Sequence, residues 1–247
     1  MEYCFTFGES VIFMSVCNMI PDASDDALVR KLIDAIRNNG GGISSSASPI
    51  IVPVKVENNS EINDCFVSVE KKIQRDGGNS ILGWALRKEQ FLMSAEFHAI
   101  WKSPQGEFLD ITPKGFLVPH GQDIMISTDK IMFVIAPHAS YEGKQVPNVN
   151  INMSGNPLVD DIIVCFDCKF VLFNKGDRAL QYGTIELTGQ EANDFQNLEI
   201  ISMGLHAMAN RNLKSKNALC FCGTNERYKH CHRRILKQIA CRAGITL

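Results

Sequence analysis

The sequence predicts an α+β protein, in which an antiparallel sheet packs against helices and a small cysteine-rich module follows at the C-terminus. Strand-like stretches between residues 50 and 136 follow one another through short turns, as antiparallel strands do. Cysteine and histidine then gather between residues 220 and 232.

The length of the chain limits the number of domains, and its net charge limits the class of partner. The chain has 247 residues and is 45% hydrophobic, enough for one large domain, or for one domain with a small module. We expect a main domain at residues 1–210 and a module at residues 218–247. The net charge of −2 argues against a dedicated nucleic-acid-binding protein at the level of the whole chain.

The cysteines indicate a reducing compartment. There are nine, an odd number, and no basic segment followed by an apolar run marks a signal peptide. No apolar run is long enough to cross a membrane. We therefore expect a cytoplasmic protein without a membrane partner, with its cysteines used as ligands, nucleophile or core residues.

The first elements follow local signals. Residues 1–20 are rich in β-branched and aromatic side chains and predict one or two strands. A helix is expected next, capped by Ser24 and closed by Gly40. Residues 50–56 contain Pro53, which favours an edge strand.

A second helix is predicted over residues 60–76 and places Cys65 in its first turn. Phe66, Val69 and Ile73 give this helix an apolar stripe. The positive end of a helix dipole favours a thiolate over a thiol. The alternative is a core cysteine in an ordinary helix.

A hairpin is expected to bring His98 near Asp110. Residues 80–92 and 94–101 read as strands, Ser103 to Gly106 as a turn, and residues 107–112 as the returning strand. A turn centred near residues 104–105 puts His98 opposite Asp110 or one residue away, within reach of a hydrogen bond. Taken singly, the two side chains are equally compatible with a core histidine and a carboxylate near a turn.

Together, Cys65, His98 and Asp110 form a candidate thiol triad. Their order along the chain, with the phrases His98-Ala99-Ile100-Trp101 and Leu109-Asp110-Ile111-Thr112-Pro113, resembles the transglutaminase-like and arylamine-acyltransferase core of the papain-like superfamily. The resemblance implies a thiol-dependent amide-bond enzyme, a peptidase, deamidase or acyltransferase. Cys65 would be its nucleophile, His98 its base and Asp110 the residue that orients His98. No aromatic residue stands just before Cys65, where some members carry one.

The second half is predicted to contain strands, a long loop and one helix. Residues 116–136 predict two strands and residues 140–157 a long loop. Residues 162–173 predict a strand with Cys165 and Cys168, whose spacing is that of a zinc half-site or a redox pair. Side chains three apart in a strand face opposite ways, which opposes joint ligation, so we expect core residues. Another strand over residues 180–187, a helix over residues 188–211 and a linker at residues 210–218 follow.

The tail carries the most specific motif, Cys220-x-Cys222-x8-Cys231-His232. Three thiolates and one imidazole meet the tetrahedral preference of zinc, and they predict one structural ion. The stretch resembles the SEC-C motif, the zinc-binding tail of the SecA preprotein translocase. It departs at Phe221, where proline is usual, and at Thr224-Asn225, where Ser-Gly is usual. His230 is a rival fourth ligand, and residues 233–243 predict a short basic helix.

A second class of function stays open. Arg227, Lys229, Arg233, Arg234 and Lys237 form a dense basic patch beside the expected metal. A non-catalytic adaptor would use this surface to bind an acidic protein or ribosomal partner. The alternative is a solvated basic face that binds no partner. Nothing in the chain is a specific nucleic-acid signal.

Overall fold

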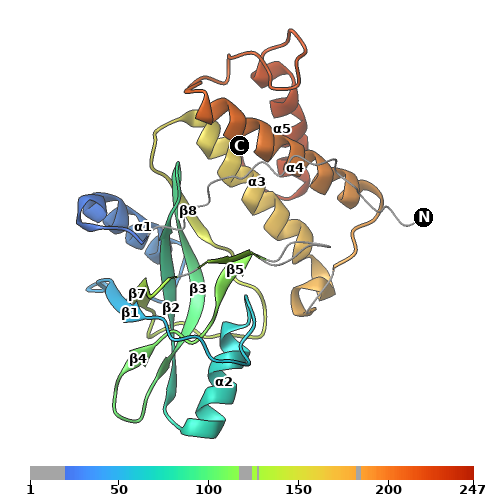
Figure 1. Ribbon diagram of the computed structural model, residues 1–247. Coiled ribbons are helices and arrows are strands. Elements are labelled where there is room, and N and C mark those ends of the chain that lie inside the picture. Colours follow the sequence, from blue (N-terminus) through green and yellow to red (C-terminus); the bar gives the residue numbers. More distant parts are fainter. Residues whose placement is uncertain (1–19, 117–123, 127, 182–184) are drawn as a thin grey trace.

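The computed structural model describes residues 20–116, 124–126, 128–181 and 185–247. It is an α+β fold, as predicted. Figure 1 shows a central sheet with α1 and α2 beside it, and a separate group formed by α3, α4 and α5. The expected strands at residues 1–20 lie outside the described residues, except for Ile20, which is in no strand. No helix among the described residues combines the length and the apolar character that crossing a membrane requires.

The main sheet is antiparallel. Its order is β1-β7-β2-β3-β4, with β8 also paired to β3, and β5 and β6 form a separate pair. The strands are β1 (Ile50–Pro53), β2 (Asn79–Lys88), β3 (Leu92–Lys102), β4 (Phe108–Leu109), β5 (Lys114–Phe116), β6 (Ile124–Ile126), β7 (Lys130–Ile135) and β8 (Val149–Asn152). The first of these, β1, lies at the edge of the sheet as Pro53 predicted, and β8 falls within the expected loop.

The sheet curls so that its ends meet. Beyond β1 and β4, Val54 and Asp110 form a parallel bridge. The curl encloses a small apolar cluster that includes Phe133. On the neighbouring strand, a Cβ at Gly83 would lie 2.2 Å from the Val134 carbonyl oxygen and 2.5 Å from the Phe133 ring, so only glycine fits there.

Two helices are anchored to the sheet by tryptophan. α1 (Asp26–Asn38) is preceded by a turn of 3₁₀ helix, η1 (Ala23–Asp25), which Asp22 caps in place of the expected Ser24. Trp84 donates to the Gly41 carbonyl just after α1, at 2.8 Å. Trp101 donates to the Gly77 carbonyl at the end of α2 (Cys65–Asp76), at 2.9 Å.

The second half is helical. It contains α3 (Pro157–Phe173), η2 (Gly176–Leu180), α4 (Gly189–Asn210), η3 (Tyr228–His230) and α5 (His232–Arg242). The strand predicted over residues 162–173 is therefore wrong, because α3 occupies that stretch. Of the strand expected over residues 180–187, residues 182–184 lie outside the described part and the rest is in no strand.

One apolar cluster joins these helices to the tail. Ile162 and Leu198 share it with Tyr228 and Leu236, all fully buried, and Leu92 is its one fully buried member from the sheet among the described residues. Cys165 and Cys168 are buried in it on one face of α3, so they are core residues as expected, although for a different reason. Burial raises the pKa of Cys168 to about 11, which keeps its thiol protonated.

Candidate active site and metal centre

The loop before α2 is tied to the segment that carries Asp110. Asp110 donates its backbone N–H to the Pro53 carbonyl at 2.9 Å, and its own carbonyl accepts from the N–H of Lys55 at 2.8 Å. The Ser60 hydroxyl donates to the Ile111 carbonyl at 2.8 Å. These bonds fix the start of α2, and so Cys65, beside the end of β4.

His98 and Asp110 form a buried ion pair. The Nε2 atom of His98 lies 3.1 Å from Oδ2 of Asp110, and the side chains are 2% and 0% exposed. The register pairs Trp101 with Leu109, so Ile100 rather than His98 stands opposite Asp110. The contact is therefore diagonal, from a residue on the same face of β3 two positions away, and the pairing expected from the turn was misplaced.

Cys65 and His98 line one small pocket. It holds about 250 Å³ of space, part of it open to solvent. On one side of β3, residues 92–95 pair with β8 and residues 101–102 pair with β4. Residues 96–100 between them have no partner strand on that side among the described pairings, and the pocket lies at this gap. The Cys65 thiol is buried, makes no hydrogen bond to His98, and also contacts an apolar cluster with Trp101.

The second ring nitrogen of His98 is free. Within the described part of the chain, Nδ1 is buried and has no hydrogen-bond partner. Because Nε2 faces Asp110, Nδ1 is the nitrogen available to Cys65 or to a molecule in the pocket. Which nitrogen carries a proton depends on the charge state of the ring.

Lys114 is a member of this site that the sequence did not reveal. Its Nζ lies 2.6 Å from Asp110 Oδ2 and 3.1 Å from His98 Nε2, and the residue is 8% exposed. The signal was weak: Lys114 stands four residues after Asp110, but not on a helix, where that spacing would pair them. The Thr112 N–H donates to Asp110 Oδ1 at 3.0 Å and turns the chain so that Lys114 folds back.

A second ion pair borders the pocket. Arg87 of β2 binds Glu96 of β3, and both side chains line the pocket. Glu96 shares a strand face with His98, but no sequence pattern indicated its partner. This pair adds polar walls without adding net charge.

Electrostatics favour a charged His98. Burial and the Lys114 ammonium lower the pKa of His98, but Asp110 and Cys65 outweigh them and raise it to about 9. Burial raises the pKa of Asp110, yet His98 and Lys114 hold it well below its usual range. At neutral pH the cluster therefore contains an imidazolium beside a carboxylate.

The start of α2 has unused hydrogen-bond donors. No side chain caps the helix, and the N–H groups of Cys65, Phe66 and Val67 have no acceptor among the described residues. Such groups attract negative charge. Since Cys65 lines the pocket, the first turn of α2 borders it.

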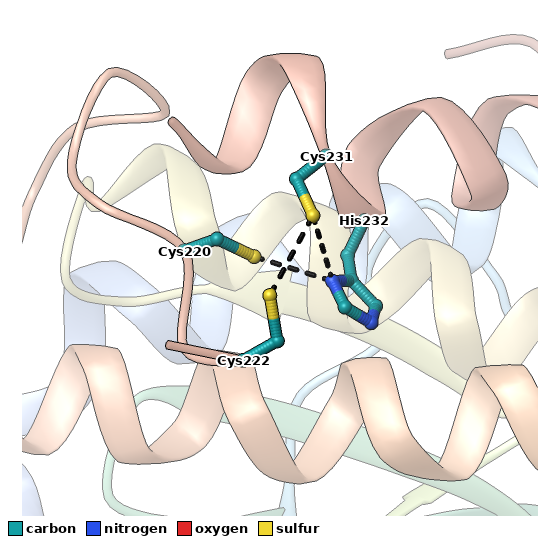
Figure 2. A group of neighbouring side chains, drawn as sticks. All are labelled: Cys220, Cys222, Cys231 and His232. Carbon is teal, nitrogen blue, oxygen red and sulfur yellow. Dashed lines mark hydrogen bonds between the residues drawn. The ribbon is translucent and has the colours of Figure 1, made fainter. Parts of the chain in front are cut away.

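The four predicted metal ligands converge. Figure 2 shows the side chains of Cys220 and Cys222 pointing toward Cys231 and His232 at the start of α5. Their ligand atoms all lie within 4.8 Å of one another. Cys220 Sγ and Cys231 Sγ lie 3.2 and 3.3 Å from His232 Nδ1, and Cys222 Sγ lies 3.6 Å from Cys231 Sγ.

The grouping is consistent with a site for one zinc ion. Atoms bound tetrahedrally at about 2.0–2.3 Å from a zinc lie roughly 3.3–3.8 Å apart, close to the three short distances here. Zinc bound there would hold the loop against the start of α5. His230, the rival ligand, is exposed and outside the cluster.

Neighbouring side chains support the ligands. The Thr224 hydroxyl lies 3.1 Å from Cys222 Sγ, and together with the Thr224 backbone it lowers the pKa of Cys222 to about 7. Burial raises the pKa of Cys231 to about 11. The Phe221 ring packs on the His232 ring with centroids 4.5 Å apart, and it fills the notch that Gly204 leaves in α4.

A buried carboxylate ties the metal-binding tail to α3. Asp161, 1% exposed, accepts from the Tyr228 hydroxyl at 3.1 Å, from Arg233 Nε at 2.8 Å and from Lys216 Nζ at 2.8 Å. This removes Arg233 from the free basic surface. The exposed cations of the patch are Arg227, Lys229, Arg234 and Lys237.

Comparison with known proteins supports the metal site alone. Residues 217–234 match the SEC-C motif, a span that contains all four ligands. No curated protein and no solved structure matches the chain. The resemblance to a transglutaminase-like core thus gains no support from relatives, whereas the C-terminal segment is similar to a known zinc-binding motif.

Proposed function

We propose that the protein is a thiol-dependent amide-bond enzyme with a structural zinc module. The observation that carries the proposal is the convergence of Cys65 and His98 on one pocket, with Asp110 in an ion pair with His98 at 3.1 Å. These residues come from α2, β3 and the segment after β4. Such a convergence of thiol, imidazole and carboxylate supports nucleophilic chemistry.

Each residue then has one task. His98 holds the proton of Cys65 at Nδ1, and Asp110 orients the ring through Nε2. The Cys65 thiolate attacks the carbonyl carbon of an amide, the C–N bond breaks, and the amine leaves with the proton from His98. Water or a second amine then displaces the thiolate from the thioester, which completes hydrolysis or acyl transfer.

The zinc module would hold the tail in place. Its ligand set leaves no open position, which is typical of structural sites rather than catalytic ones. We propose zinc as the resident ion, with Cys220, Cys222, Cys231 and His232 as ligands.

The test is the reactivity of Cys65. In wild-type protein at pH 6–7, iodoacetamide followed by peptide mapping should label Cys65 faster than the exposed Cys241, which is outside both sites. His98→Ala should remove that excess, because the imidazolium no longer stabilises the thiolate. Labelling of Cys65 at one slow rate in both proteins would contradict the proposal.

A second candidate is a non-catalytic adaptor. Two observations favour it: the match to the SEC-C motif, and the packing of Cys65 in an apolar cluster without a hydrogen bond to His98. Its partner would be an acidic protein or a ribosomal surface. Charge reversal at Arg234 and Lys237 should then abolish salt-sensitive binding, whereas reversal of Arg233 would disturb the fold through Asp161.

A further inference from the structure

The pocket beside Cys65 has an excess of buried positive charge. Lys114 and His98 are cations, Asp110 is the one anion that contacts both, and all three are at most 8% exposed. The neighbouring Arg87–Glu96 pair is neutral as a whole. While Cys65 is a thiol, these groups leave a net charge of one positive unit, and a buried charge without a counterion is costly. A Cys65 thiolate would supply that counterion.

Three sets of donors lie in or beside this pocket. His98 Nδ1 is buried without a partner in the described chain. Lys114 lines the pocket and has three N–H donors, of which Asp110 accounts for one. The first turn of α2 adds backbone N–H groups that no side chain caps.

We propose that this pocket binds a carboxylate group, held by the Lys114 ammonium, by Nδ1–H of His98 and by the free N–H groups at the start of α2. A single negative charge balances the cluster, which favours a monoanionic carboxylate over a phosphate dianion. The pocket is small and partly open to solvent, so the ligand would be a small group or the end of a chain. The inference goes beyond the proposed reaction, because Cys65 need not act for the carboxylate to bind.

A pair of alkylating reagents tests the site in wild-type protein. Iodoacetate carries a carboxylate and iodoacetamide does not, while both alkylate a thiolate and release iodide. The ratio of their rates at Cys65 is divided by the same ratio at Cys241 in the same sample. We expect this normalised ratio of iodoacetate to iodoacetamide to be about ten, the effect of one charge-assisted hydrogen bond.

Substitution of the lysine should remove the preference. With Lys114→Met the normalised ratio should fall to about one, and Lys114→Gln, which keeps donors without charge, serves if the first variant does not fold. Lys71→Met is the matched control, since Lys71 is an exposed lysine of α2 outside the pocket and its loss should change nothing. A ratio of one in wild-type protein, or one that survives both Lys114 substitutions, would overturn the proposal.

A second measurement separates this inference from the enzyme proposal. If neither reagent labels Cys65, the nucleophile is in doubt but the carboxylate site is still measurable. Acetate at constant ionic strength, compared with chloride, should raise the melting temperature of Cys65→Ala and not that of Cys65→Ala/Lys114→Met. Equal responses of the two variants would refute carboxylate binding.

Discussion

At the scale of single residues, Asp110 is the side chain on which the pocket depends. It lies between two buried cations, and its Oδ1 also accepts from the Thr112 N–H. Without its charge, His98 and Lys114 would be two like charges in contact. The free energy cost of such an arrangement is large because the surrounding protein screens it poorly.

We therefore expect Asp110→Asn to destabilise the fold. Breaking a buried ion pair by removing one partner costs roughly 3–5 kcal/mol. Urea denaturation followed by circular dichroism measures the loss, and Asp129→Asn, at an exposed site, is the control. A change below about 1 kcal/mol would mean that His98 is neutral in the folded protein.

The same pair gives stability a defined pH dependence. The folded pKa of His98 is raised to about 9, so its contribution is complete below its unfolded value near 6.5 and is lost as pH rises through 9. The folded pKa of Asp110 is lowered, so its contribution is complete above its unfolded value near 3.9 and is lost in acid. The urea concentration at the unfolding midpoint should decrease as the pH is raised from 7 to 9.5 in the wild type. The decrease should be smaller in His98→Gln. Equal losses in both proteins would assign the alkaline limb to other groups.

At the scale of elements, the four candidate metal ligands connect residues 220–222 to the start of α5, and α4 packs against both. Purified protein should carry one zinc per chain by elemental analysis. Cys222→Ser should reduce zinc binding and increase hydrogen exchange in residues 218–242, because a zinc bound by the four ligands would cross-link residues 220–222 to the start of α5. Cys241→Ser, outside the cluster, is the control and should keep its zinc. Zinc-free wild-type protein with the same exchange rates would contradict the prediction.

The contact between α4 and Phe221, which stands between the candidate ligands Cys220 and Cys222, depends on one glycine. A Cβ at Gly204 would lie 2.3 Å from Cγ of Phe221, so the ring must move, and with it the packing on His232. Gly204→Ala should lower the free energy of unfolding by about 1–3 kcal/mol, as overpacking does. In a double-mutant cycle, Phe221→Ala should relieve much of the cost of Gly204→Ala. Additive effects would show that the two residues are not coupled.

At the scale of the whole molecule, the apolar core does not end at the expected domain boundary between residues 210 and 218. The sheet packs with α1 and α2, while α3 and α4 share a cluster with the tail through Tyr228 and Leu236. Asp161 on α3 and Asp194 on α4 each bind arginine from α5 or its start, Arg233 and Arg242. The tail thus covers the apolar faces of α3 and α4.

We accordingly expect a fragment of residues 1–210 to be less stable than the full chain. Removal of the tail would expose apolar surface on α3 and α4, which costs about 25 cal/mol for each Å². A lower melting temperature and binding of a hydrophobic dye would follow, measured against the full chain with zinc bound. If the fragment matches the full chain in both, the expected domain boundary between residues 210 and 218 is an independent folding boundary.

Much of the architecture was readable from local patterns. Amphipathic periodicity located α1 and α2, and turn residues located β2, β3 and the turn between β3 and β4. The helix expected over residues 188–211 corresponds to α4, although its sequence is only weakly amphipathic. α3 was predicted as a strand because its own residues are apolar around most of the helix. Such an apolar run has no periodicity that distinguishes a buried helix from a strand. β8 was missed because its polar sequence forms a strand only when it pairs with β3.

The sequence by itself determined the metal ligands and the position of Cys65 at the start of a helix. Both are local: four ligands lie within residues 220–232, and the apolar stripe of α2 follows directly after Cys65. Only the tertiary structure decided that Lys114 joins His98 and Asp110, that Arg87 pairs with Glu96, and that α3 and α4 share their core with the tail. These contacts join residues through register, sheet curvature and helix packing, and such long-range geometry leaves no periodic trace in the chain.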